Sequence, residues 1–542
     1  MKRITVFMGL FSALQVYAQT GSWTDTAARI ENIFSRYKPN NPGIQVAVSR
    51  NGLLLFSKAW GMADLEHAVP LTTSSVTEAG SVSKQFTAAA ILLLEQEGKL
   101  SLDDGVRKYI PELPEYERPV SIRQMMQHTS GLKDWGSIAA IGGWPRSTKT
   151  YSNEDALYII SRQKTLNNQP GDEFIYSNSN YNLFAIIVKR VSGMSLYDFC
   201  RKKIFDSAGM KHTEWRANFR KIVPNRAIAY SKGGEGYLTN MPNEYVYGNG
   251  GLLTTTEDLV KWNDYYAGGK LGNPSLLQKQ ITSGKLTNGI QHNYAAGLFI
   301  EKYRGLDLWT HNGATAGYRS NLDYFPSLGL SIAWLSNTSE FDGNPFNLSI
   351  ALREIFVPKP PTETAIKQPP AITLDAEKLK TLTGWYRNSR DGSGINLFIK
   401  DALLNSNTGL WIKPVADNIF MVGYNKIEFL PGNQRIWFIT PAKDSTLFTR
   451  MDSANINAGN LEEYTGEYYS DETETKFAVQ AKNGKLVLLQ KPSNEFVLKP
   501  TYKDGFESAA GPVWFERDKK KKIIQLKISV GRARNIRFDK MR

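Results

Sequence analysis

The sequence predicts an α/β domain whose sheet is formed by the two ends of the same region, followed by two smaller all-β modules. Apolar, strand-like runs occupy residues 43–64 and again residues 306–337, whereas helical patterns dominate from Lys84 to about Lys270. Strands separated by such a helical stretch can share one sheet with helices packed on its faces. A proline-rich spacer then precedes a tail of short β-rich runs broken by Gly, Asn and Asp.

The elements of the first region follow from short local patterns. "ENIFSRYKP" has the spacing of an amphipathic helix, and the next run contains two apolar strands joined at Asn51-Gly52, a strong signal for a two-residue hairpin. The strand-like "LDLWTHNGATAGYRS" and "LGLSIAWLSN" come near the end and precede the helical "NPFNLSIALREIF". We therefore expect one domain over residues 19–356.

The second half of the chain begins with a spacer, "VPKPPTETAIKQPPAI", which cannot hold a helix and predicts a semi-rigid linker over residues 357–373. Beyond it, "LKTLTGWYRN" and "LEEYTGEYYS" share Leu-x-x-x-Thr-Gly-x-Tyr about 80 residues apart. This spacing predicts two β modules, each a small barrel or sandwich, at residues 374–453 and 459–542. Strand packing alone is the alternative explanation of the shared motif.

The first residues carry the pattern of an export signal. Two basic residues precede an apolar run from Ile4 to Val16, and the small residue Ala18 follows, which predicts a secretory signal peptide over residues 1–18. An uncleaved membrane anchor is the alternative, but the run is shorter than the ~20 residues that a membrane span needs. We expect an exported bacterial protein, periplasmic or secreted, without a transmembrane segment after cleavage.

Composition limits the partners that we expect. The formal net charge is +14, and the run from Lys519 to Lys522 could attract an anionic surface such as cell-wall polymer, although a solvated strand end or turn is the explanation that we favour. We expect no nucleic-acid partner for an exported chain. Cys200 is the only cysteine, so no internal disulfide is available, and the five histidines show no metal-ligand spacing. We expect no metal and no cofactor, and the sequence carries no signal for the oligomeric state.

One Ser-x-x-Lys stretch stands at the start of a strongly apolar helix pattern. In "EAGSVSKQFTAAAILLLEQEGKL", Ser81 and Lys84 are three residues apart and so share one helix face. Two further Ser-x-x-Lys stretches begin at Ser35 and Ser161, about what chance supplies. Burial would lower the pKa of Lys84 so that it accepts the serine proton, and the helix dipole would favour developing negative charge. A serine cap with an outward-facing lysine is the structural alternative.

A serine–lysine nucleophile needs a further residue that carries a proton. It also needs residues that form the opposite wall of the substrate pocket. Tyr-x-Asn occurs four times, but only Tyr176-Ser177-Asn178 lies between a Pro-Gly turn and a buried-helix pattern. His-x-Gly occurs once, as His311-Asn312-Gly313, at the end of the strand-like "LDLWT". There the glycine would let a substrate approach the edge of the strand. A lone histidine at a strand end is more often structural.

The three motifs, in this order, resemble those of the penicillin-recognising serine hydrolases. The chain looks most like the branch with class C β-lactamases, D-stereospecific peptidases and related esterases, since "MMQHTSGL", "PGDEFIYSN" and "GNGGLLTTTEDLVKW" are also similar to that branch. The resemblance covers about residues 44–356 and implies a β-lactamase/transpeptidase-like α+β domain with an antiparallel sheet flanked by helices. The two β modules resemble the lipocalin-like barrels appended to some D-aminopeptidases.

The family resemblance implies a role for each catalytic candidate. Ser81 would attack a carbonyl and form an acyl-enzyme. Lys84 and Tyr176 would share the general-base work and relay the proton to the leaving group. All three are therefore candidate catalytic residues.

The same resemblance implies the substrate-binding residues. Asn178 would bind the acyl side chain of the substrate, and the backbone N–H groups of Ser81 and Ala314 would form an oxyanion hole. His311 and Gly313 would complete the opposite wall. Because His311 stands where β-lactamases carry the lysine of Lys-Thr-Gly, the pattern favours peptidases and esterases.

We therefore expect an exported serine hydrolase that cleaves an amide or ester bond. The substrate that we favour is a small peptide with D-residues, which could derive from the cell wall. A β-lactamase or a carboxylesterase of the same superfamily is the first alternative. A non-catalytic protein that binds envelope material, or senses it, is the alternative from another class.

Overall fold

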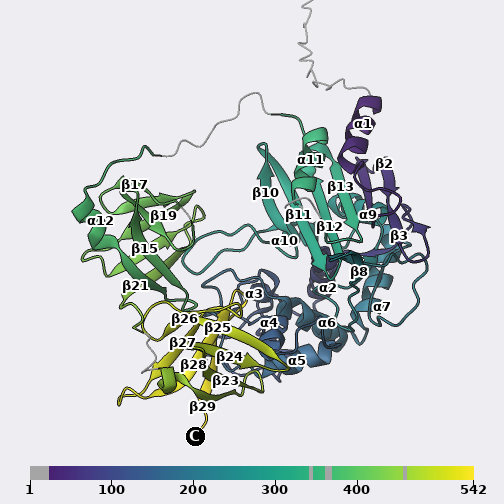
Figure 1. The fold of residues 1–542 in the computed structure, drawn as a ribbon. Helices are drawn as coiled ribbons and strands as arrows, with labels where there is room; N and C mark the ends of the chain where they lie inside the picture. The colour runs from purple at the N-terminus through teal and green to yellow at the C-terminus, as the bar shows by residue number, and fades with distance from the viewer. Residues whose placement is uncertain (1–22, 341–345, 360–368, 410, 456–460) are drawn as a thin grey trace, which may run out of the picture.

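The computed structural model describes residues 23–340, 346–359, 369–409, 411–455 and 461–542. The predicted signal peptide, residues 1–18, and the middle of the predicted linker lie outside these ranges. Figure 1 shows the chain passing from a large domain of helices and strands into a green β module and then into a yellow barrel.

The first domain is built around a six-stranded antiparallel sheet in the order β10-β11-β12-β13-β1-β2. Its strands are β1 (Ile44–Arg50), β2 (Leu53–Trp60), β10 (Phe299–Tyr303), β11 (Leu306–Thr315), β12 (Tyr318–Phe325) and β13 (Leu330–Ser336). β1 pairs with β13 from Ile44 opposite Ser336 onward, so the two ends of the domain form one sheet, as predicted. The predicted hairpin joins β1 to β2, with Asn51 and Gly52 at φ values of 52° and 80°.

Helices cover both faces of this sheet, as Figure 1 shows. Alternate residues of β13 divide between two cores: Ile332 and Trp334 pack with α1 and α11, whereas Ala333 and Leu335 join the helical body on the other face. The helices are α1 (Trp23–Phe34), α2 (Lys84–Gln96), α3 (Ile122–Met126), α4 (Trp135–Ile141), α5 (Asn153–Ser161), α6 (Asn178–Ser192), α7 (Leu196–Cys200), α8 (Asp206–Ala208), α9 (Thr256–Ala267), α10 (Pro274–Ile281) and α11 (Phe346–Phe356). In the described ranges, no helix has the length and apolar character that a bilayer span requires.

Short turns and strands complete the domain. The turns are the 3-10 helices η1 (Gly80–Ser83), η2 (Val106–Lys108) and η4 (Pro326–Leu328) and the π-helical turn η3 (Arg201–Phe205). The small strands are β3 (Met62–Asp64), β4 (Val69–Pro70), β5 (Thr77–Glu78), β6 (Glu214–Trp215), β7 (Tyr230–Gly233), β8 (Gly236–Thr239) and β9 (Leu252–Thr254). β9 pairs with β5 directly before η1, which ties that turn to the loop ahead of α9.

Two all-β modules follow, which confirms the predicted fold class. After α12 (Ala376–Leu382), eight strands form one sheet: β14 (Gly384–Asn388), β15 (Gly394–Lys400), β16 (Leu403–Ser406), β17 (Lys413–Ala416), β18 (Ile419–Val422), β19 (Asn425–Phe429), β20 (Arg435–Ile439) and β21 (Ser445–Met451). After η5 (Leu461–Tyr464), a closed barrel contains β22 (Gly466–Ser470), β23 (Thr475–Lys482), β24 (Lys485–Gln490), β25 (Asn494–Pro500), β26 (Gly505–Glu507), β27 (Val513–Arg517), β28 (Ile523–Val530) and β29 (Ala533–Lys540).

The repeated Leu-x-x-x-Thr-Gly-x-Tyr motif builds the same corner in both modules. A short helical segment ends at the residue before the motif's threonine, and the glycine after that threonine begins the first strand. The tyrosine is fully buried in each case, and its hydroxyl donates to a carbonyl four residues earlier, Tyr386 to Leu382 at 3.0 Å and Tyr468 to Tyr464 at 2.7 Å. The motif therefore fastens a helical turn to a strand.

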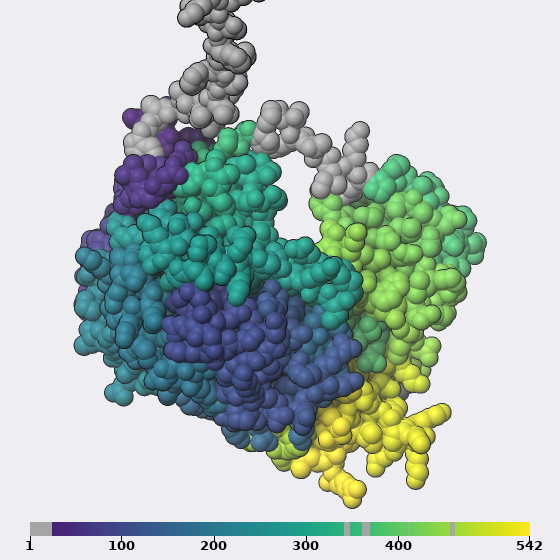
Figure 2. Space-filling view, turned by 180° about the vertical axis from the view of Figure 1, so that it is seen from behind, coloured from purple at the N-terminus to yellow at the C-terminus, as the bar shows by residue number. Residues whose placement is uncertain are grey.

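The barrel is docked on the first domain beside α4 and α5. Figure 2 shows its yellow surface against the blue part of that domain. Ile138 and Ile141 of α4 belong to the barrel's hydrophobic core, and Gln490 donates to the carbonyl of Ile141 at 2.8 Å. A buried ion pair joins Lys133 to Glu472 at 2.9 Å, with 0% and 10% of the side chains exposed. Apolar packing and a desolvated ion pair thus fix the barrel's position next to α4.

Candidate active site

Ser81 lies in η1, the tight turn that leads directly into α2. Every residue of α2 from Lys84 to Leu94 is buried, as the apolar pattern predicted. The neighbouring serine holds the turn: Ser83 donates to the carbonyl of Gly80 and accepts from the backbone N–H of Leu252 at 3.1 Å. Because Ser83 has this structural role, the hydroxyl of Ser81 is left to face Lys84.

Two glycines let η1 press against β11. Gly80 has a φ of +50°, and a Cβ there would lie 2.7 Å from the backbone nitrogen of Ala314. A Cβ on Gly313 would lie 2.1 Å from the carbonyl oxygen of Ala79. This close packing puts Ser81 and Ala314 on the wall of one pocket. Gly313 itself does not line that pocket, so the packing of η1, and not the expected approach of a substrate, explains this glycine.

We predict that Gly313→Ala destabilises the protein by about 2 kcal/mol or more, because its Cβ would overlap backbone atoms that cannot move aside. The matched control is Gly105→Ala, since Gly105 has a φ of −65° and a Cβ there would meet nothing within 4 Å. Thermal unfolding of both variants checks the prediction. Equal midpoints for the two variants would contradict the packing argument.

Lys84 makes the central contacts of the site. Its Nζ lies 3.1 Å from Oγ of Ser81 and 3.0 Å from Oδ1 of Asn178, and it also donates to the carbonyl of Asn249. The side chain is completely buried, and in the described ranges no carboxylate forms an ion pair with it. A lysine in this setting has lost its hydration without gaining a counter-charge.

The electrostatics of the site favour a neutral lysine. Burial lowers the pKa of Lys84 well below its ordinary value, and the positive charge of Arg532 lowers the pKa further. Asp134 acts in the opposite direction, but its Oδ2 accepts the backbone N–H of Asn178 at 2.8 Å and does not bond the lysine. Lys84 is therefore suited to accept a proton from Ser81.

Tyr176 stands next to this lysine, and its hydroxyl is near that of Ser81. Nζ of Lys84 lies 4.9 Å from the centre of its ring, and the hydroxyl is buried without a hydrogen-bond partner in the described part of the chain. Burial raises the pKa of Tyr176 well above its ordinary value and outweighs the lowering by the Ser81 hydroxyl and by Arg532, so the phenol stays protonated. The ring packs on His128 at 4.2 Å between centroids, and Nδ1 of His128 accepts the backbone N–H of Ser177. His128 thus positions the tyrosine loop from behind.

His311 is a neutral group of the opposite wall. It is 2% exposed, its Nδ1 lies 2.6 Å from the carbonyl of Asn312, and its Nε2 lies 3.2 Å from the hydroxyl of Tyr294. Burial, together with the nearby charge of Lys84, lowers the pKa of His311 to about 3. His311 therefore brings no positive charge to the site at neutral pH.

These groups surround a pocket of about 480 Å³. Its walls are formed by Gly80, Ser81, Arg146, Phe174, Tyr176, Asn178, Asn249, Gly250, Phe299, His311, Asn312, Ala314, Thr315 and Arg532. Five of the seven predicted site residues are in this set. Of the other two, Lys84 lies beneath Ser81 and Gly313 faces η1.

Sequence reasoning missed several residues that line this pocket or support its walls. Asn249 and Gly250 come from "GNGG", a run whose glycines signal an unusual backbone, and the carbonyl of Asn249 holds Lys84. Asp134 caps α4 and fixes Asn178, a role that its position before an apolar run could have suggested. Arg532 comes from the far end of the chain, and no local pattern marks it.

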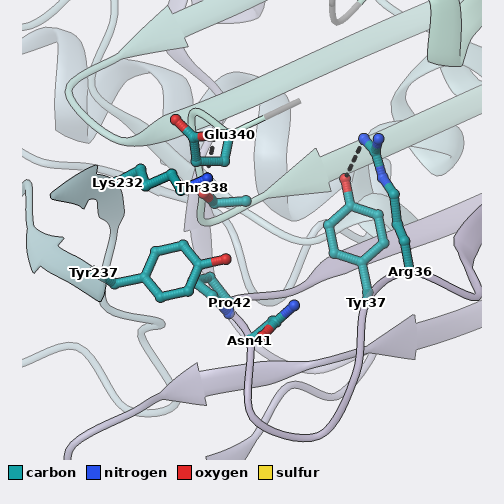
Figure 3. A pocket seen from close by; sticks show the side chains of 8 residues that line it. All are labelled: Arg36, Tyr37, Asn41, Pro42, Lys232, Tyr237, Thr338 and Glu340. Atoms are coloured by element: carbon teal, nitrogen blue, oxygen red, sulfur yellow. Dashed lines mark hydrogen bonds between the residues drawn. The ribbon is translucent and has the colours of Figure 1, made fainter. Parts of the chain in front are cut away.

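A second pocket lies elsewhere on the first domain, as Figure 3 shows. It measures about 190 Å³ and contains Arg36, Tyr37, Lys232, Tyr237 and Glu340, none of which line the first pocket. Within the described ranges, no three His, Cys, Asp or Glu side chains gather as a metal ion would require. The pocket at Ser81 is therefore the candidate active site.

The sheet, the buried serine–lysine pair and the facing tyrosine define a penicillin-recognising serine hydrolase fold. The chain belongs to the Beta-lactamase family, whose model matches residues 30–354. Among curated relatives, a D-aminopeptidase of Brucella anthropi is 27% identical over 62% of this chain and 62% of its own length. Penicillin-binding protein 4* of Bacillus subtilis is 26% identical over 76% of this chain and 90% of its own length. The chain thus spans about three fifths of the D-aminopeptidase.

Solved structures share the fold. An octameric penicillin-binding protein homologue from Pyrococcus abyssi superimposes with a TM-score of 0.54 at 22% identity, over 79% of this chain and all of its own. A D-amino acid amidase from Ochrobactrum anthropi gives a TM-score of 0.52 at 21% identity, over 61% of this chain and 98% of its own. At these identities the similarity is one of fold alone.

Proposed function

We propose that this chain is a serine hydrolase that forms an acyl-enzyme on Ser81 and cleaves an amide or ester bond. The observation that carries the proposal is Lys84, completely buried and placed 3.1 Å from Oγ of Ser81. Burying a lysine without a counter-charge costs stability, and such groups cluster at functional sites. The buried hydroxyl of Tyr176, which lies near that of Ser81 in the same pocket, supports the same conclusion.

Acylation uses these residues in a fixed order. Neutral Lys84 accepts the proton of Ser81 as Oγ attacks the carbonyl carbon. The negative charge on the carbonyl oxygen is held by the backbone N–H groups of Ser81 and Ala314, which line the same pocket. Tyr176 passes a proton to the leaving nitrogen or oxygen and regains one from Lys84, so the bond breaks with a neutral leaving group.

Deacylation runs the same relay with water. Lys84 and Tyr176 remove a proton from water as it attacks the acyl carbon, and the proton returns to Oγ of Ser81 when the ester bond breaks. Asn178 holds the acyl portion through its amide group, since its Oδ1 is occupied by Lys84 and its nitrogen remains to donate.

We propose a small peptide or amide with a D-residue as the substrate class. The names of the D-aminopeptidase and D-amino acid amidase relatives support this choice. The neutral His311 argues against a β-lactamase, which would use a cation at that position, while a carboxylesterase would need the same serine–lysine pair. A non-catalytic binder does not explain a buried, unpaired lysine. The predicted signal peptide supports action outside the cytoplasm.

The pH dependence of turnover tests this assignment. We predict that kcat/KM for a neutral ester rises with pH as Lys84 loses its proton, and that the rise ends well below the ordinary lysine pKa of 10.5. The sign follows because the neutral lysine is the active form, and a lowered pKa extends that form to lower pH. Arg532 and Arg146 lower this pKa, and Asp134 raises it.

The measurement is kcat/KM from about pH 5 to about pH 9 with a neutral p-nitrophenyl ester. Because His311 has a pKa of about 3 and Tyr176 stays protonated, we expect one rising limb from Lys84 and no falling limb. A limb with its midpoint near 10.5, or a profile governed by a histidine near neutrality, would contradict the role of Lys84.

A further inference from the structure

The C-terminal barrel places one arginine at the mouth of the candidate active site. Arg532 lies in the two-residue turn between β28 and β29, and its carbonyl accepts the backbone N–H of Asp134 at 2.9 Å and the amide of Asn167 at 3.0 Å. Its guanidinium carbon lies 4.8 Å from the centre of the Tyr176 ring. The turn is thus fixed to the first domain, and its side chain is held on a residue of the pocket wall.

Arg532 differs from the other arginines around it because it has no acidic partner. Arg146 is bonded to both carboxylate oxygens of Glu244, and Arg534 pairs with Glu173 at 2.8 Å. Arg532 is an exposed residue, and across the described ranges its guanidinium makes no hydrogen bond and no ion pair. The pocket wall also contains no aspartate or glutamate.

We propose that Arg532 binds a carboxylate of the substrate, so that this enzyme selects anionic amides or esters. The inference rests on the proposed function, because it concerns the substrate of the Ser81 site. A guanidinium presents a planar pair of donors that matches a carboxylate, and stacking on Tyr176 already restricts its orientation. Arg532 and Ser81 line the same pocket of about 480 Å³, so one small substrate contacts both.

The charges of the wall support this choice of ligand. With His311 neutral and Arg146 compensated by Glu244, Arg532 is the uncompensated cation in the described wall of the pocket. A carboxylate neutralises this charge, whereas an ammonium group would be repelled. The barrel therefore contributes a specificity-determining residue to a site whose catalytic groups all belong to the first domain.

Two matched substrate pairs test the proposal, one with the carboxylate on the acyl side and one with it on the leaving group. The first is mono-p-nitrophenyl glutarate against its neutral glutaramate counterpart. The second is acetyl-D-Ala-D-Ala against its C-terminal amide. For at least one pair, we expect kcat/KM to favour the anionic member by about 10- to 100-fold, the range of a charge-assisted hydrogen bond.

Arg532→Gln should reduce this preference to about onefold, and Arg532→Lys should leave an intermediate value because it keeps the charge without the planar donor pair. The control is Arg537→Gln, which removes the same charge from β29. There Arg537 forms an exposed ion pair with Asp539 of the same strand. The control should keep the wild-type ratio. A wild type without preference in either pair, or an unchanged ratio in Arg532→Gln, would overturn the inference.

Binding separates this result from the fate of the proposed function. In the Ser81→Ala background, calorimetry compares acetyl-D-Ala-D-Ala with its amide, with and without Arg532→Gln. Tighter binding of the anionic peptide that depends on Arg532 supports the inference even if the wild type hydrolyses neither the peptides nor the p-nitrophenyl esters, a result that would remove the hydrolase alone. Equal binding of both peptides, with hydrolysis intact and without preference, would remove the inference alone.

Discussion

Ser81→Ala is expected to lower kcat for an activated ester by about 10⁴-fold or more while the protein keeps its fold. The loss is large because Oγ of Ser81 is the atom that forms the new bond, and no other hydroxyl in the described structure lies within hydrogen-bond reach of Lys84. Steady-state hydrolysis of a p-nitrophenyl ester, followed by the release of p-nitrophenol, measures the effect.

The matched control for this variant is Ser161→Ala. Ser161 also begins a Ser-x-x-Lys stretch, but its exposed hydroxyl donates to the carbonyl of Tyr158 at 2.8 Å and takes no part in the pocket. Its kcat should equal that of the wild type. Ester hydrolysis by Ser81→Ala at a wild-type rate would remove the nucleophile from the account.

Arg216→Met is expected to have the largest effect on stability, about 3–5 kcal/mol. Arg216 is 1% exposed and pairs with two buried carboxylates, Glu78 at 2.7 Å and Glu244 at 3.3 Å. Removing it leaves Glu78 buried without its cation. Glu78 also accepts the backbone N–H of Gly251 at 3.0 Å, directly beside the residues that hold Lys84, so activity should fall together with stability.

Urea unfolding of the first domain measures this loss, with Arg190→Met as the control. Arg190 forms an ion pair with Glu112 at 2.6 Å, but both side chains are substantially exposed, at 36% and 41%. Such a pair is worth about 0–1 kcal/mol. A similar loss of unfolding free energy in the two variants would show that the buried ion pairs of Arg216 stabilise the protein no more than an exposed pair does.

The fold of the first domain was predictable because its signals are local. Asn51-Gly52 specifies a hairpin turn by its backbone preferences, and β13 carries the apolar run Ile332 to Leu335, which suits a strand buried on both faces. The spacing of residues along the chain does not specify that β1 pairs with β13. The pairing follows because both apolar strands need to be covered by the same helices, which favours a single shared sheet. The positions of the two β modules relative to the pocket had no such signal.

The catalytic candidates were predictable for a different reason. Ser35, Ser161 and Ser81 share one motif, and only Ser81 precedes a mostly apolar helix, whose residues from Lys84 to Leu94 are all buried. Burial is what gives a serine–lysine pair its chemistry, so the composition of the following turns distinguished the three stretches.

Residues that act through tertiary contacts escaped sequence reasoning. Gly313 is a glycine because the carbonyl of Ala79 occupies the place of its Cβ, and that neighbour comes from a distant part of the chain. Arg532 reaches the pocket only because Lys133 and Glu472 help to dock the barrel beside α4. Neither contact leaves a pattern in the residues next to it.

Intact mass of the protein after incubation with benzylpenicillin, and in parallel with a p-nitrophenyl ester quenched in acid, tests the central claim most directly. We predict a mass increase of one acyl group with at least one of the two reagents, located by peptide mapping at Ser81 and absent from Ser81→Ala. The same adduct on Ser81→Ala, or no adduct on a wild type that turns over the ester, would contradict an acyl-enzyme at Ser81.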